Sequence, residues 1–163
     1  MLRKPSLETS LEEWENVIRI NLTGTWLVDN EVARSMIKQG NFEGRRIINV
    51  SSGYATMVGP LPEASYVASK AGIANLTRDL AMEWAKFGIN VNAIAPGVFY
   101  PTNMTRPLAN DPEMLKFMSN RTLKKRLGDP KKDLKGIVVF LASDASEYVT
   151  GQIIYVDGGW NAW

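Results

Sequence analysis

The chain has 163 residues, of which 45% are hydrophobic and 22% charged, and its formal net charge is +2. These values predict one globular domain with a core of its own, and the small charge gives no reason to expect a nucleic-acid partner. No stretch reaches the ~18 apolar residues of a membrane span, and residues 1–5 lack the apolar run of a secretory signal, so we expect a cytoplasmic protein without a membrane partner. Because cysteine and histidine are absent, disulfides, thiol nucleophiles, Ser-His-Asp catalysis and the usual zinc sites are excluded.

A long helix is predicted near the beginning of the chain. Ser10 and Glu13 have the spacing of a capping box, and apolar residues follow at helical spacing to about residue 38. Asn21 lies in the middle of this helix beside Thr23 and Gly24, and such a run weakens the helix and favours a local bend. From the residues alone, Asn21 belongs either to a small-residue packing face or to a functional site.

A short β-branched run over residues 45–51 predicts a buried strand, and two serines end it. Neighbouring strand residues point to opposite faces, so only one of the two hydroxyls is expected to face a site. Counting back from Tyr66, we favour Ser52 over Ser51. A loop with Gly and Pro follows over residues 53–64. Its larger residues either line a pocket or cover the core: Tyr54, Met57 and Val58.

A second helix is predicted over residues 65–87, ended by Gly88. Tyr66 and Lys70 are four residues apart and therefore lie on the same face of this helix. An ammonium group beside a phenol favours the phenolate and lowers the phenol pKa, which would allow Tyr66 to transfer a proton near neutral pH. With histidine absent, this pair is the candidate for acid/base chemistry.

Residues 89–95 predict the next buried strand, which ends at Pro96 and Gly97. A glycine at the carboxyl end of a strand lets the backbone approach a ligand closely, and open α/β sheets bind ligands at such ends. The alternative is a plain turn.

The last third of the chain is less regular. Residues 103–128 predict short helices that form an apolar lid, a helix is predicted to start at Asp129 and run through Ala142, and residues 153–156 predict a strand. Helices that alternate with three apolar strands indicate an α/β fold with a parallel sheet, in a single domain over residues 1–163. The basic residues between 124 and 132 are interleaved with aspartates, which indicates solvated surface rather than a phosphate site.

Taken in this order, the motifs resemble those of the short-chain dehydrogenase/reductase family. The resemblance covers nearly the whole chain and implies the C-terminal, catalytic half of a doubly wound, Rossmann-like parallel sheet. It also implies four catalytic residues, with Asn21 holding a water that is linked to Lys70. The segments that carry the resemblance are Asn21-Leu22-Thr23-Gly24, Ile47 to Ser52, Tyr66-x-x-x-Lys70, Asn90 to Gly97 and Val149 to Trp160, and the implied catalytic residues are Asn21, Ser52, Tyr66 and Lys70.

The resemblance further implies NAD or NADP as cofactor, hydride transfer with a small carbonyl or secondary-alcohol substrate, and no metal. Thr102 stands one residue later than the family pattern places its threonine. Gluconate and deoxygluconate dehydrogenases look nearest, followed by 3-oxoacyl reductases, and family members commonly pair through the helices of Asn21 and Tyr66, which implies a homo-oligomer. The residues that would hold the cofactor are Tyr66, Lys70, Pro96, Gly97, Val98 and Thr102.

A dinucleotide-binding fold begins with a strand, a Gly-rich turn and a helix whose N-terminus holds the pyrophosphate, and no such turn follows a strand here. The chain therefore looks like the family's catalytic half without the first four strands, which bind adenine and choose between NAD and NADP. The strand over residues 47–50 then becomes an edge with unpaired backbone groups, which favours association. The alternative hypothesis is a truncated, non-catalytic interaction protein.

Overall fold

A parallel three-stranded sheet forms the centre of the computed structural model, which describes residues 2–40 and 43–163. The strand order is β1 (Arg45–Val50), β2 (Ile89–Pro96) and β3 (Ile153–Val156), so β1 is an edge strand of the described sheet, as predicted. In the register, Ile47 lies opposite Val91, and Ala93 lies opposite Ile153. The sheet confirms the predicted α/β class.

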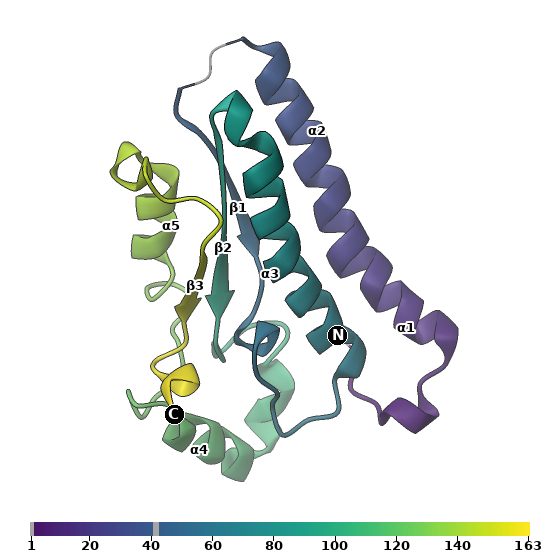
Figure 1. Cartoon of the computed structure of the whole chain (residues 1–163). Helices are drawn as coiled ribbons and strands as arrows, with labels where there is room; N and C mark the ends of the chain where they lie inside the picture. Colours follow the sequence, from purple (N-terminus) through teal and green to yellow (C-terminus); the bar gives the residue numbers. More distant parts are fainter. Residues whose placement is uncertain (1, 41–42) are drawn as a thin grey trace.

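Helices cover both faces of the sheet (Figure 1). On one face lie α1 (Leu11–Ile18), α2 (Gly24–Lys38) and α3 (Ala64–Trp84), and on the other lies α5 (Lys135–Ala142). The strands all point towards α4 (Pro112–Arg121), and the last residues of the chain lie beside this helix. The carboxyl ends of the strands and α4 therefore face one another, as in the ligand-binding end of an open α/β sheet.

The first long helix is interrupted where the sequence predicted a weak point. The capping box is present, because the Glu13 amide donates to the Ser10 hydroxyl and the Ser10 amide donates to the Glu13 carboxylate. Residues Arg19–Thr23 then form a π-helical turn between α1 and α2, with Asn21 at its centre. The Thr25 hydroxyl donates to the Asn21 carbonyl at 2.7 Å, so this side chain supplies the carbonyl with a hydrogen-bond donor. Such π turns are frequent at functional sites.

The main core lies between the sheet and the α2–α3 layer. After α3 and a 3-10 turn (Ala85–Phe87), Gly88 ends the helical segment with a left-handed φ of 64°, as expected of a helix stop. A polar group is buried in the same layer, where Asn49 of β1 meets Asp29 of α2 and Thr77 of α3. The buried apolar residues of this core are Ala33, Ile47, Leu80, Ala81, Trp84, Ile89 and Val91.

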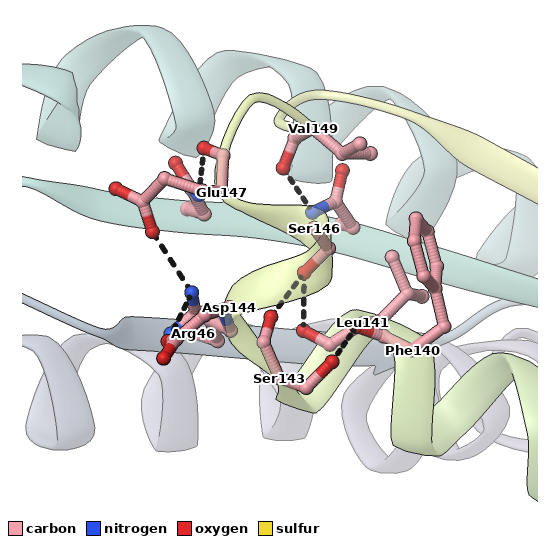
Figure 2. A network of polar contacts seen from close by, with 10 residues as sticks. Arg46, Phe140, Leu141, Ser143, Asp144, Ser146, Glu147 and Val149 are labelled. Atoms are coloured by element: carbon pink, nitrogen blue, oxygen red, sulfur yellow. Dashed lines mark hydrogen bonds and ion pairs between the residues drawn. The ribbon is translucent and has the colours of Figure 1, made fainter.

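On the other face, a polar network fastens the turn after α5 to β1 (Figure 2). The Arg46 guanidinium, whose side chain is only 6% exposed, donates to the carboxylates of Asp144 and Glu147 at 3.1 and 2.9 Å. The Ser146 hydroxyl donates to the carbonyls of Leu141 and Ser143 and closes the turn that follows the helix. These contacts hold α5 against the sheet.

The predicted start of this last helix is wrong, because α5 begins at Lys135 rather than at Asp129. The Asp133 carboxylate accepts hydrogen bonds from the Asp129 amide and from Arg126, which fixes the residues before α5 as turns. Across the two described ranges, none of the helices is both long and apolar enough to cross a membrane.

Candidate active site

A cavity of about 430 Å³ opens at the carboxyl ends of β1 and β2, between the start of α3 and the segment that contains α4. Two of its walls are the segments that directly follow these strands, and a third is the first turn of α3. Seven of the eight residues that the sequence analysis singled out line it: Ser52, Tyr66, Lys70, Pro96, Gly97, Val98 and Thr102.

The two serines after β1 have different partners. Ser52 lies in the cavity wall, 8% exposed, and its hydroxyl accepts a hydrogen bond from the Tyr54 amide at 3.2 Å. The Ser51 hydroxyl donates to the main-chain carbonyl of Lys70 at 2.8 Å and is therefore engaged in joining β1 to α3. This difference supports the choice of Ser52 as the site hydroxyl.

Tyr66 and Lys70 lie together on the first turns of α3, with the Lys70 Nζ 5.7 Å from the centre of the Tyr66 ring. The ammonium donates to the Val50 carbonyl at 2.9 Å and so ties α3 to the end of β1. Burial lowers the pKa of Lys70, because the charged ammonium is partly removed from water. The two groups therefore lie side by side, as their helical spacing predicts.

The pKa of Tyr66 shifts in the direction opposite to the one that the sequence predicted. Burial raises the pKa of Tyr66, interaction with the Ser52 hydroxyl opposes the rise, and the Glu63 carboxylate adds to it. Desolvation of the phenolate thus outweighs any benefit from Lys70, whose ammonium is hydrogen-bonded to Val50. Tyr66 is a protonated phenol at neutral pH in this structure.

Asn21 does not line the cavity. Its Nδ2 donates to the Ser69 hydroxyl at 3.0 Å, and that hydroxyl donates to the Tyr66 carbonyl at 2.7 Å, which links the π turn to α3. Asn21 borders a second hollow of about 700 Å³ along the edge of β1, and Lys70 borders both this hollow and the cavity. A water between Asn21 and Lys70 stays a prediction.

The sequence did not indicate an ion pair in the cavity wall between a buried Glu63 and a more exposed Arg3. Glu63 is 4% exposed, and its Oε1 accepts a hydrogen bond from the Arg3 Nε at 2.8 Å. The Lys4 amide donates to the Pro62 carbonyl and holds the first segment against this loop. No local pattern signals this pairing, because its members are sixty positions apart in the sequence.

The lid residues form an apolar wall, as predicted. Leu108 and Met118 line the cavity and are 6% and 2% exposed. They pack against Trp160, which follows β3 and is 3% exposed, and which the sequence analysis did not connect with the site. Gly97 packs closely against Asp157, since an added Cβ would lie 2.7 Å from the Asp157 Cβ. That glycine therefore has a packing role as well as its place in the cavity wall.

Comparison with known proteins identifies the family. The family model described as enoyl-(acyl carrier protein) reductase matches residues 1–161. The 2-dehydro-3-deoxy-D-gluconate 5-dehydrogenase of Dickeya dadantii is 44% identical over 160 residues, which are 98% of this chain and 61% of that protein. The galactitol 2-dehydrogenase (L-tagatose-forming) of Cereibacter sphaeroides is 38% identical, with coverages of 97% and 61%.

A solved structure extends this likeness to the fold. The gluconate 5-dehydrogenase of Burkholderia cenocepacia, in complex with NADP and tartrate, matches with a TM-score of 0.91 and 35% identity, over 99% of this chain and 61% of that chain. The α/β fold and the sequence matches together show that this chain belongs to the short-chain dehydrogenase/reductase family. The resemblance to gluconate-type members is confirmed, and the chain spans about 61% of the length of these relatives.

Proposed function

We propose that this chain carries the catalytic site of an oxidoreductase that transfers a hydride between NAD or NADP and a carbonyl or secondary alcohol of a sugar acid. The observation that carries the proposal is the convergence of Ser52, Tyr66 and Lys70 in one cavity at the carboxyl ends of β1 and β2. The sugar-acid class is supported by the names of the relatives, 2-dehydro-3-deoxy-D-gluconate 5-dehydrogenase and gluconate 5-dehydrogenase.

The donors in the cavity fit the nicotinamide end of such a cofactor. Tyr66 and Lys70 offer a hydroxyl and an ammonium for ribose oxygens, and Pro96, Gly97, Val98 and Thr102 would border the ring. Within residues 2–40 and 43–163, no strand is followed directly by a Gly-rich turn and an α-helix, so these residues supply no pyrophosphate turn. When bound, the nicotinamide would give or accept the hydride.

In the direction of carbonyl reduction, Tyr66 would act as the general acid. Its phenol is protonated at neutral pH, as that of an ordinary tyrosine is and as its raised pKa maintains, so it can give its proton to the substrate oxygen as negative charge develops there. The Ser52 hydroxyl would donate a hydrogen bond to the same oxygen. Lys70, held by the Val50 carbonyl, would stabilise the phenolate that remains, and in alcohol oxidation the proton would move back to Tyr66. Asn21 would support Lys70 through a bound water.

The first test is a titration of the purified chain with NADH and with NADPH, followed by the fluorescence of its five tryptophans. We expect saturable binding that is lost in Lys70→Ala and kept in Lys86→Ala, because Lys86 lies beyond the far end of α3 over the Phe87 ring. Tyr66→Phe should still bind the nucleotide, with an affinity lowered only by the lost ribose hydrogen bond, and should lose turnover of sugar acids.

Two results would contradict the proposal. Substantial turnover by Tyr66→Phe would remove Tyr66 from the mechanism. Absence of nucleotide binding by a chain shown to be folded would favour the alternative, a non-catalytic interaction protein.

The homo-oligomer is a further part of the proposal. Large apolar side chains are exposed on the outer surface of the first helices, and Trp26, Leu27 and Val28 are 46%, 53% and 62% exposed. Exposed apolar patches on a helical face commonly mark association surfaces. Light scattering of the purified chain should give a mass of at least two chains, and a concentration-independent monomer would contradict this part.

A further inference from the structure

The turn over residues 157–163, which follows β3, forms part of the cavity wall. Its Trp160 is 3% exposed and packs against Leu108 and Met118, and all three side chains line the cavity. Met118 belongs to α4, so this turn and α4 together close one side of the cavity. The contacts that hold α4 in this position therefore determine the access to the cavity.

Three residue pairs join the turn to the end of α4 and the residues after it. The Arg121 guanidinium stacks on the Trp163 ring, with Cζ 4.2 Å from the ring centre, and its Nη2 donates to the Trp163 carbonyl at 2.9 Å. The Lys124 amide donates to the Gly158 carbonyl at 3.1 Å. Gly159 has a left-handed φ of 83° and packs so closely on Leu123 that an added Cβ would lie 2.7 Å from its Cδ1.

Further hydrogen bonds stabilise the turn, both within the turn and to the opposite wall of the cavity. The Asp157 carboxylate accepts hydrogen bonds from the Gly159 and Asn161 amides at 2.9 and 2.8 Å, which fixes the turn's own shape. The Asn161 Nδ2 donates to the Thr56 hydroxyl at 3.4 Å, and Thr56 lies in the loop that follows Ser52. The turn thus bridges the loop after β1 and the end of α4, on two sides of the cavity.

We propose that the turn over residues 157–163 is a clasp that holds α4 over the cavity, with Arg121 and Trp163 as its releasable contact. Trp163 is 63% exposed, whereas Trp160 is buried, so the outer contact can open while the inner one stays packed. Release of Arg121 frees the end of α4 and lets Met118 move away from the cavity. The consequence for substrate entry rests on the proposed function, whereas the clasp itself does not.

The test uses the absence of cysteine from the chain, because one introduced cysteine is then the only thiol. Met118→Cys places this thiol on α4 at a position that is 2% exposed, where a small thiol reagent reaches it only when α4 moves. In that background we expect Trp163→Ala and Arg121→Ala to speed labelling by about threefold or more, as loss of a cation–π contact implies. Trp163→Phe, which keeps a ring, should restore most of the slow rate.

A matched control is Lys125→Ala. The Lys125 Nζ donates to the Asn120 carbonyl at 2.8 Å, so it contacts the end of α4 without touching the clasp, and its removal should leave labelling unchanged. A second reporter, Ala74→Cys in α3, is 4% exposed and detects unfolding of the whole chain, and Trp163→Ala should not accelerate it. Hydrogen exchange of residues 112–121 in the cysteine-free chain gives the same comparison if Met118→Cys disturbs packing.

Equal labelling and exchange rates in the parent and in Trp163→Ala would overturn the clasp. Equal acceleration at both reporters would overturn it as well, because the variant would then only destabilise the fold. Absence of nucleotide binding and turnover from the parent as well as from every variant, with faster labelling still confined to α4, would overturn the proposed function and leave the clasp supported.

Discussion

Replacement of Asn49 tests how the buried polar group holds the two site-bearing helices against β1. The Asn49 Nδ2 donates to the Asp29 carboxylate at 2.9 Å and to the Thr77 hydroxyl at 3.1 Å. All three residues are nearly inaccessible to water, with exposed fractions of 5%, 4% and 0% for Asn49, Asp29 and Thr77. Asn49→Ala therefore removes one donor that serves two buried acceptors, and water cannot readily replace it.

The magnitude follows from the two lost bonds. A hydrogen bond to a charged group contributes about 1.5–3 kcal/mol and a neutral one about 0.5–1.5 kcal/mol. We therefore expect Asn49→Ala to lower the free energy of unfolding by about 3 kcal/mol, most of it from the Asp29 carboxylate that is left unpaired. If this is the cause, the Asp29→Ala, Asn49→Ala double variant should be less destabilised than the sum of the two single variants by about 1 kcal/mol.

The assay is urea unfolding at pH 7, followed by tryptophan fluorescence. Asn90→Ala is the matched control, because the Asn90 Nδ2 donates to the Glu147 carbonyl at an exposed position of β2, and its loss should cost less than about 1 kcal/mol. A loss below about 1 kcal/mol for Asn49→Ala, or one equal to that of the control, would show that the two hydrogen bonds of Asn49 do not stabilise the fold in this way.

Three further predictions concern the same layers and the cavity wall. Because burial raises the pKa of Tyr66, and raises that of Tyr54 to about 12, an absorbance titration should show two tyrosines that ionise above the ordinary value of about 10, and Tyr66→Phe should lack one of them; an unchanged titration of the variant would contradict the assigned burial of Tyr66. Gly97→Ala should lower the free energy of unfolding by about 1–3 kcal/mol, because its Cβ would lie 2.7 Å from the Asp157 Cβ, and unchanged urea unfolding would show that the backbone can yield. Burial also raises the pKa of Asp29 above its ordinary value of 3.8, so the fold loses stability as the pH rises from that value through the folded pKa. Asp29→Asn should therefore be more stable than the parent at pH 7 and lose this advantage below pH 3.8. Urea unfolding measures both stabilities, and a variant that is less stable than the parent at pH 7 would contradict the raised pKa of Asp29.

Local patterns were sufficient for the central pair of the candidate site. Tyr66 and Lys70 required only the period of a helix. Strand alternation indicated that only one of Ser51 and Ser52 faces the site, and the count back from Tyr66 together with the family resemblance selected Ser52. The weak stretch around Asn21 also came from local propensity, and it is found as the π-helical turn Arg19–Thr23. The helix pair and the weak stretch depend on residues within one or two turns of one another, so a single sequence contains the necessary information.

The start of α5 shows where local reasoning failed. Asp129 followed by proline is a typical helix start, but the Asp133 carboxylate binds the Asp129 amide and Arg126, and the helix begins only at Lys135. A side chain that bonds to nearby backbone competes with the helix, and the sequence pattern does not show which of the two prevails.

The amino-acid sequence was enough to predict the alternation of helices and strands, the family, and the residues that meet at the carboxyl ends of β1 and β2. Only the tertiary structure paired Arg3 with Glu63, placed Trp160 in the cavity wall and turned the Asn21 amide towards Ser69. The direction in which the Tyr66 pKa shifts also depends on the tertiary structure, because burial and neighbouring groups together determine it. Burial and contacts between distant segments exist only once the chain is packed, which is why no local pattern could supply them.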